Sequence, residues 1–367
     1  MAPRIVLFGA TGYTGDLTAR ELVRRGARPV LAARSAERLE ALASELGDLE
    51  TQVADVTRPE SVRALVDEGD VLITTVGPFM RWGEPALEAA LGARAHYLDS
   101  TGEPPFIRHV FEDAGPRAEA TGVGLMTAMG YDYVPGNLAG ALALRDGGEQ
   151  ATRVEVGYFW EGGTSAGMSG GTQASAAGVM LERGYRWRAG RLVSERAARR
   201  VRRFDVGAGR RAQAVSIGSS EHFALPRLGR NVWDVDVYLG WFGPASRAMQ
   251  VAAAGTDVVV RVPGVKPGMH ALLSRFVKGS TGGPDAAARA ATRSVIVAEA
   301  FDAGGAQLSH VRLVGPNGYD LTAAFLAFGA LQAAAGRLKA AGALGPVDGL
   351  GLDALEAAAA DAGLVRG

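Results

Sequence analysis

A turn with three glycines carries the most specific chemistry in this sequence of 367 residues. It reads Gly9-Ala10-Thr11-Gly12-Tyr13-Thr14-Gly15 and stands between a short apolar run and an amphipathic stretch. Where a strand turns into a helix in this way, unpaired N–H groups and the positive end of the helix dipole face one point, which suits a pyrophosphate. Gly9 would make the tight turn, Gly12 would admit the phosphate and Gly15 would let the helix approach the strand. A turn that only reverses the chain is the alternative.

The residues after the second apolar run indicate which dinucleotide binds. An acidic residue there would accept hydrogen bonds from a ribose 2′-hydroxyl, whereas an arginine would pair with a 2′-phosphate. The sequence has Arg34 at this place, and Ser35 after it can donate to the same phosphate. We therefore predict NADPH rather than NADH as the cofactor. The alternative is coincidence, because arginine is frequent throughout this chain.

Two further segments follow later apolar runs and are predicted to lie beside the same cofactor. Asp55 closes the third run, where its carboxylate would meet the adenine edge. A helix cap or a turn residue is the alternative for Asp55. Gly77-Pro78 comes after the fourth run, where the backbone would pass the cofactor.

The residues that would complete nicotinamide chemistry must stabilise charge and supply a proton. Two polar segments follow the fifth and sixth apolar runs, 99–103 and 130–137, and we predict Tyr131 and Asp132 as the catalytic residues. The alternative is structural, with Asp132 holding the turn and Asn137 capping the helix that follows. No tyrosine has a lysine four residues later, which excludes the proton relay of short-chain dehydrogenases.

The composition excludes several other classes of protein. Lys plus Arg and Asp plus Glu number 39 each, so no net field attracts a nucleic acid and we expect no such partner. The sequence has no cysteine, and its five histidines show no paired ligand spacing, so we expect no metal site. Without a signal-peptide pattern at the start, and with the longest apolar run confined to 321–336, we expect a cytoplasmic protein.

The periodicity of residues 4–128 predicts the elements that position these groups. Short apolar runs alternate with amphipathic stretches, the pattern of parallel strands joined by crossover helices. Ser35 is expected to cap the second helix, and Thr57 with Glu60 has the spacing of a capping box before the third. The fold class is therefore α/β with a Rossmann-type doubly wound parallel sheet, whose strands we predict at 5–8, 29–33, 51–56, 71–76, 95–99 and 123–127.

After residue 130 the pattern changes to half-buried strands and tight turns. Turns at Ala189-Gly190 and at 303–305 predict hairpins, and hence a second, α+β domain with a mainly antiparallel sheet. Its strands are expected at 154–160, 231–239 and 294–300, and short helices at 171–183 and 269–278. We predict a dinucleotide-binding domain at 1–130, a substrate or interaction domain at 131–318, and a helical tail at 319–367 that returns to the first domain.

Read in order, these motifs resemble the saccharopine dehydrogenase-like family, and within it the trans-acting enoyl reductases of actinobacterial lipid and polyketide pathways. The motifs that carry the resemblance are the glycine turn, Arg34, Gly77-Pro-Phe79, the segment 130–136 and the segment 315–323. The resemblance implies an NADP-binding oxidoreductase with an inserted substrate domain. It also implies that Ser169, Gly170 and Thr172 bind the substrate, at a helix start whose alternative is a simple cap.

The resemblance further implies an acyl substrate that arrives as a thioester on coenzyme A or on an acyl carrier protein, including the carrier of a polyketide synthase. Both carriers are acidic, and seven arginines between Arg196 and Arg211 would supply docking charge. A solvated surface strand is the alternative for this run. A homodimer is also among the expected assemblies.

Three functions remain open at this point. The first is an NADPH-dependent enoyl reductase that reduces a C=C bond of an acyl or polyketide thioester. The second is a saccharopine-type reductase of an imine or dehydrogenase of a secondary amine, which would need an acidic clamp around the amine. The third is a regulator that binds NADP and catalyses nothing.

Overall fold

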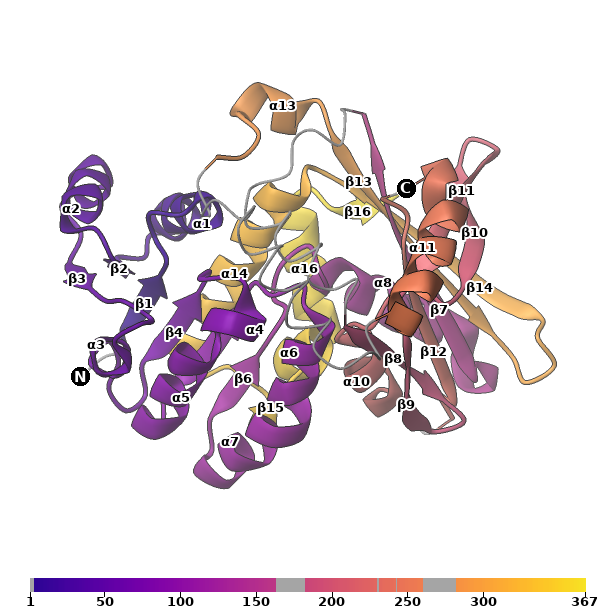
Figure 1. The fold of residues 1–367 in the computed structure, drawn as a ribbon, viewed down its shortest axis with the longest axis horizontal. Coiled ribbons are helices and arrows are strands. Elements are labelled where there is room, and N and C mark those ends of the chain that lie inside the picture. The colour runs from indigo at the N-terminus through magenta and orange to yellow at the C-terminus, as the bar shows by residue number, and fades with distance from the viewer. Residues whose placement is uncertain (1–2, 163–181, 230, 242, 260–281) are drawn as a thin grey trace.

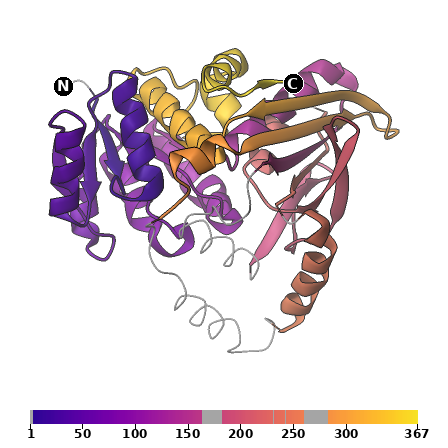
Figure 2. The same ribbon diagram turned by 90° about the horizontal axis from the view of Figure 1, so that it is seen from above.

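Two β-sheets lie side by side in the computed structural model, which describes residues 3–162, 182–229, 231–241, 243–259 and 282–367 (Figure 1). The first sheet, on the left of Figure 1, comes mainly from the indigo and magenta part of the chain. The second sheet, on the right, comes from later residues, and helices pack between and around the two sheets, as Figure 2 also shows.

The first sheet has seven strands, and every pairing in it is parallel. The predicted doubly wound parallel sheet is therefore confirmed. Chain order reverses between β1 and its neighbour β4, which creates the switch point where ligands bind in sheets of this kind. In spatial order the strands are β15 (Gly342–Ala343), β6 (Gly124–Met126), β5 (His96–Asp99), β4 (Val71–Thr74), β1 (Ile5–Phe8), β2 (Val30–Ala33) and β3 (Thr51–Val53).

The crossover helices begin largely where the sequence predicts. Ser35 caps α2, because its hydroxyl accepts a hydrogen bond from Arg38 N at 3.4 Å. The capping box at Thr57 is wrong: Arg58 starts α3 without a side-chain cap, since the Thr57 hydroxyl donates to Asp55 Oδ1 at 2.9 Å. The helices are α1 (Tyr13–Arg24), α2 (Ala36–Glu45), α3 (Pro59–Arg63), α4 (Phe79–Trp82), α5 (Glu84–Ala93), α6 (Pro104–His109) and α7 (Gly115–Thr121).

The second sheet has nine strands and is antiparallel except for the pair β7 and β12. The predicted mainly antiparallel sheet is confirmed, with hairpins at Ala189-Gly190 and at 302–306. Its main path is β10 (Val201–Gly207), β11 (Arg210–Ser216), β12 (Asp234–Leu239), β7 (Arg153–Glu161), β13 (Arg293–Phe301), β14 (Gln307–Gly315) and β16 (Val365–Arg366), with β8 (Arg183–Arg188) and β9 (Arg191–Arg196) beside β12.

One continuous hydrophobic core joins the two sheets. Helix α8 (Val134–Gly147) carries the connection, because it follows β6 and packs on β7, β13 and β14. The remaining helices of the second region are α10 (Glu221–Ala224), α11 (Ser246–Val259) and α13 (Ala286–Ala290). The helices expected at 171–183 and 269–278 lie wholly or almost wholly outside the described residues.

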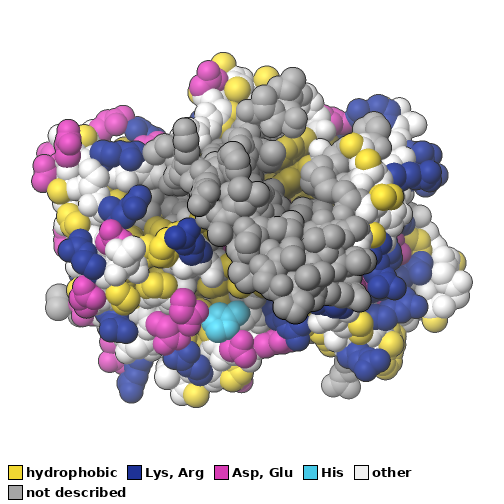
Figure 3. Space-filling view, viewed as in Figure 1, with side chains coloured by type: hydrophobic (Ala, Val, Ile, Leu, Met, Phe, Trp, Pro, Cys, Tyr) yellow, Lys and Arg dark blue, Asp and Glu magenta, His cyan; other side chains and the backbone are white. Residues whose placement is uncertain are grey.

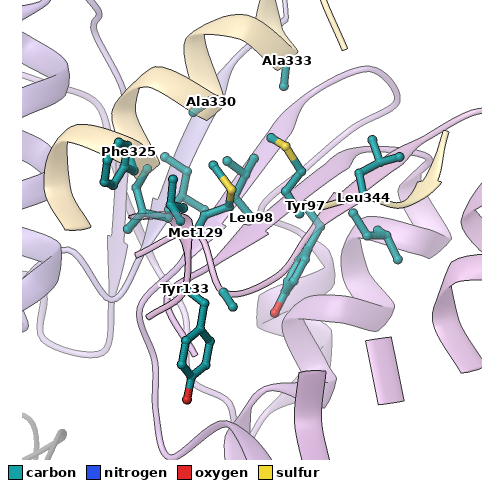
Figure 4. Packing of buried hydrophobic residues seen from close by; sticks show 14 of the residues in the cluster. Tyr97, Leu98, Met129, Tyr133, Phe325, Ala330, Ala333 and Leu344 are labelled. Atoms are coloured by element: carbon teal, nitrogen blue, oxygen red, sulfur yellow. The ribbon is translucent and has the colours of Figure 1, made fainter. Parts of the chain in front are cut away.

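The last part of the chain contacts both sheets. Helix α14 (Gly318–Ala334) contacts α1, β4 and β5, and a Cβ at Gly329 would come within 2.8 Å of Leu98 Cδ2. Figure 4 shows Phe325, Ala330 and Ala333 of α14 over Leu98 and Met129. β15 extends the first sheet and β16 the second, with α15 (Pro346–Leu350) and α16 (Leu352–Asp361) between them. The three domain limits stay a prediction.

The apolar run at 321–336 forms most of the buried helix α14. Within the described part of the chain, every helix falls short of the length and apolar character that a bilayer crossing requires.

The contact between α1 and β1 predicts a large effect of one methyl group. In Gly15→Ala the new Cβ would overlap Gly9 O and come within 2.8 Å of Gly9 C, both backbone atoms. We expect the free energy of unfolding to fall by about 1–3 kcal/mol, measured by urea denaturation. Gly92→Ala is the matched control, because a Cβ in this helical position meets no atom within 4 Å. It should gain roughly 0.5–1 kcal/mol; equal stability of the two variants would refute the contact.

Candidate functional site: the carboxyl edge of the parallel sheet

All the predicted cofactor and catalytic residues that the structure describes follow strands of the first sheet. The glycine turn follows β1, Arg34 follows β2, Asp55 follows β3, Gly77-Pro78 follows β4 and Asp132 follows β6. Because these strands are all parallel, their carboxyl ends meet at one edge of the sheet. Ser169, Gly170 and Thr172 lie outside the described residues.

The glycine turn has the backbone geometry that a phosphate site needs. Gly9 has φ +93°, a left-handed conformation that glycine adopts without a steric cost. Its N–H donates to Ala32 O at 2.8 Å, which ties the turn to β2. Gly12 starts α1, and no side chain in the described part of the chain caps this helix. The N–H groups of the first turn therefore have no side-chain acceptor, so the residues present fit a pyrophosphate.

Basic and hydroxyl groups stand at the end of β2, beside the glycine turn. Arg34 is exposed, and the Ser35 hydroxyl accepts from Arg38 N while its own proton stays available for donation. Arg38 Nη2 donates to Thr11 O at 2.6 Å, which brings a second guanidinium to the turn. The prediction from the sequence did not include Arg38. Its position one helical turn after Arg34 is the sequence feature that indicates it.

Asp55 is a turn residue in the structure. Its Oδ1 accepts hydrogen bonds from the backbone N–H and the hydroxyl of Thr57, both at 2.9 Å. The N–H donation from Thr57 is the main reason that the pKa of Asp55 is lowered, and the charge of Arg34 contributes. The predicted contact with an adenine edge stays a prediction.

Tyr13 ties the glycine turn to a distant part of the chain. Its hydroxyl donates to Pro284 O and accepts from Arg289 Nη1 at 3.1 Å. Arg289 also pairs with Asp320 at 2.8 Å, and the Tyr13 ring meets the Tyr319 ring edge-on at 4.9 Å. The Tyr13 side chain therefore packs against α14 and the segment before α13.

The loop after β4 is held by a residue that the prediction did not assign. Glu103 accepts hydrogen bonds from Phe79 N at 2.8 Å and Met80 N at 2.9 Å. These donors are the first N–H groups of α4, directly after Gly77-Pro78. Glu103 thereby fixes the place where the backbone is predicted to pass the cofactor.

Asp132 has a carboxyl oxygen with no hydrogen-bond partner among the described residues. Its Oδ1 is buried and accepts no hydrogen bond from them. A Cβ at Gly102 would lie 3.4 Å from Asp132 Oδ2, so the carboxyl lies against the loop after β5. Burial raises the pKa of Asp132 to about 7. The group can therefore hold and release a proton near neutral pH.

Tyr131 differs from Asp132 because its polar atom already has a partner. The Tyr131 hydroxyl donates to Phe159 O at 3.3 Å, and burial raises the pKa of this tyrosine well above its ordinary value. Its ring tilts against Trp160 at 6.3 Å, and Trp160 stacks on Trp241 at 4.8 Å. Trp160 is 38% exposed. The aromatic group of Tyr131, Trp160 and Trp241 therefore extends from Tyr131, which precedes Asp132 in the chain, to the surface.

A second buried carboxyl, Glu221, lies on the second-domain side of the same region. Tyr158 donates to Glu221 Oε1 at 2.5 Å, and Gly136 N donates to Tyr158 Oη at 2.9 Å. Burial raises the pKa of Glu221 to about 8, and the charge of Asp132 acts in the same direction. The neighbouring His222 has its Nδ1 3.1 Å from Ser219 Oγ, and burial lowers the pKa of this histidine to about 3.

The part of the chain that the structure describes contains no group of three His, Cys, Asp or Glu side chains placed to hold a metal ion.

Comparison with a family model identifies the first domain. Residues 5–126 match the saccharopine dehydrogenase NADP binding domain. The match contains the glycine turn, Arg34, Asp55 and Gly77-Pro78, and the cofactor of this domain is NADP(H).

Curated relatives match about half of this chain. A Mycobacterium tuberculosis protein, named provisionally as a trans-acting enoyl reductase, is 38% identical over 187 residues, which are 48% of this chain and 44% of that protein. A Mycobacterium ulcerans trans-acting enoyl reductase is 34% identical over 199 residues, 52% of this chain and 48% of that protein. The matches thus span about half the length of these relatives.

A solved structure shares the fold over the whole chain. Apo saccharopine dehydrogenase (L-Glu forming) from Saccharomyces cerevisiae aligns with 100% of this chain and 99% of its own, at a TM-score of 0.58 and 11% identity. This likeness shows that the NADP-binding domain and the second sheet together form the saccharopine dehydrogenase fold.

The position of Arg34 predicts how the NADP-binding domain distinguishes its cofactors. Arg34→Glu should weaken NADPH binding by about 10–100-fold, because it replaces a charge-assisted hydrogen bond to the 2′-phosphate with repulsion. NADH binding should change far less. Arg63→Glu, an exposed charge reversal on α3, is the control and should leave both affinities unchanged. Fluorescence titration measures the four constants, and an equal loss for both cofactors in Arg34→Glu would contradict the assignment.

Proposed function

We propose that this chain is an NADPH-dependent reductase of a polarised C=C bond in an acyl thioester, carried by coenzyme A or an acyl carrier protein. The NADP-binding domain and the two relatives named as trans-acting enoyl reductases support this proposal. The observation that carries it is the carboxyl of Asp132, whose buried Oδ1 has no hydrogen-bond partner among the described residues, at the same sheet edge as the glycine turn.

Asp132 is the proton donor in this proposal. When bound, NADPH supplies a hydride, and the carbon next to the thioester carbonyl then needs a proton. A carboxyl group with a pKa of about 7 is protonated in a large fraction of molecules at neutral pH, which suits a general acid. Tyr131 suits the role less well, because its hydroxyl proton is already donated to Phe159 O.

The state of the buried carboxyls also favours a C=C substrate over an amine. An amine clamp needs ionised carboxylates, whereas burial raises the pKa of both Asp132 and Glu221 to near or above neutrality. The aromatic group of Tyr131, Trp160 and Trp241 supplies apolar surface beside Asp132, which suits an acyl chain. Together these features support a thioester with an apolar chain.

The direct test is NADPH oxidation followed at 340 nm with enoyl thioesters, cyclic imines and no substrate. We expect turnover with the enoyl thioesters alone. Turnover with the imines alone would replace the proposal with saccharopine-type C=N chemistry. NADPH binding without turnover of any substrate would favour a non-catalytic regulator.

The role of Asp132 predicts a pH-dependent rate. Because the proton donor must be protonated, kcat/KM should fall as the pH rises through about 7. Asp132→Asn should lower kcat by roughly 10²–10⁴-fold. The fall of kcat/KM with rising pH should disappear in this variant, while its affinity for NADPH stays the same. Tyr131→Phe is the matched comparison and should lose far less, because its hydroxyl is bound to Phe159 O. The reverse order of losses would move the role from Asp132 to Tyr131.

A further inference from the structure

An open groove of about 650 Å³ lies on the second sheet, between the edge hairpin β10–β11 and α11. Its lining includes Val201, Arg203, Gln213, Arg247, Gln250 and Val251. None of the residues that line this groove is among those assigned above to cofactor binding, catalysis or substrate binding. Figure 3 shows Lys and Arg side chains gathered over the second sheet, to the right of the grey atoms.

The sheet register places the polar groups of the groove on one face. Arg203 on β10 and Gln213 on β11 are cross-strand partners, so their side chains project to the same side of the hairpin. Helix α11 is fixed on that side by a small core of Ala198, Val215 and Ala253, with Val201 packed against it. Arg247, in the first turn of α11, lines the same groove.

Most of the arginine-rich run that the sequence predicts as a docking surface is bound within the chain. Arg200 pairs with Glu195 and Asp236, Arg202 with Glu155 and Glu299, and Arg210 with Glu161. Arg196 donates to the carbonyl oxygens of Ala197, Ala198 and Gln250. The docking charge of this run is therefore smaller than its arginine count suggests.

Arg203 and Arg247 are different, because no described residue forms an ion pair with either of them. The first turn of α11 contains no acidic residue, so Arg247 lies at the positive end of the helix dipole without a compensating charge. Gln213 Oε1 is buried beside them and accepts no hydrogen bond from the described residues. The groove thus offers two guanidinium groups and one acceptor that no described residue binds.

We propose that this groove is a binding site for a phosphate ester that carries a hydrogen-bond donor, such as the phosphate end of phosphopantetheine. Guanidinium groups match phosphate oxygens with paired hydrogen bonds, and two of them can hold one phosphate group. Gln213 Oε1 accepts from a hydroxyl or amide N–H of the same ligand. The volume of the groove is that of a small-molecule site. The same chemistry is available in coenzyme A and in the prosthetic group of a carrier protein.

Isothermal titration calorimetry on the full chain saturated with NADP⁺ tests the site, because the 2′-phosphate site is then filled. We expect phosphopantetheine to bind and dephosphorylated pantetheine not to bind. Coenzyme A and a phosphopantetheinylated carrier protein are the two further arms, and they distinguish the source of the phosphate. Absence of binding by phosphopantetheine, coenzyme A and the carrier alike would overturn the proposal, whatever the outcome of the turnover assay.

Substitutions locate the binding in the groove. Arg203→Ser and Arg247→Ser should each weaken phosphopantetheine binding at least about tenfold, or about 1.4 kcal/mol, and Arg203→Lys should recover part of the loss. Arg191→Ser, an exposed arginine in the β8–β9 hairpin, is the control and should bind as the unmodified chain does. Unchanged affinity in both groove variants would overturn the site.

Discussion

The close approach of α1 to β1 is the contact on which the rest of the candidate site depends. Gly15 has no side chain and stands against the backbone of Gly9, so the helix can begin directly above the strand end. Its first N–H groups then face the edge of the sheet, where no side chain among the described residues caps them. A parallel sheet brings the loops after the six other strands to that same edge, and Arg34, Glu103 and Asp132 reach it from three of them.

The protein keeps costly polar groups in its interior at this edge. Asp132 and Glu221 are carboxyl groups whose burial favours the protonated form, and the cost of such burial must be offset elsewhere. The continuous core that joins the two sheets through α8 supplies that stability. Burial without a partner is a poor way to stabilise a fold but a direct way to hold a proton near neutral pH. We regard this ability to hold a proton near neutral pH as the reason that the Asp132 carboxyl is buried.

Much of the first domain could be predicted from the sequence, because local signals set it. The apolar runs, Ser35 as a helix cap and the position of the glycine turn all depend on neighbouring residues, and the structure agrees with them. The parts that were missed depend on long-range contacts. Arg38 reaches Thr11, and Tyr158 meets Glu221. The expected cap at Thr57 fails for a local reason instead, because Asp55, two residues earlier, accepts the Thr57 hydroxyl proton. No spacing in the sequence shows which arginines between 196 and 211 are paired, since their acidic partners come from other strands.

The central claim is that the turn at residues 9–15 binds a phosphorylated nicotinamide cofactor. Calorimetric titration of the purified, folded chain with NADPH and with NADH tests this claim most directly. The account predicts saturable heat with one cofactor per chain and tighter binding of NADPH. No heat of binding with either cofactor would contradict it, and with it the reaction proposed at Asp132.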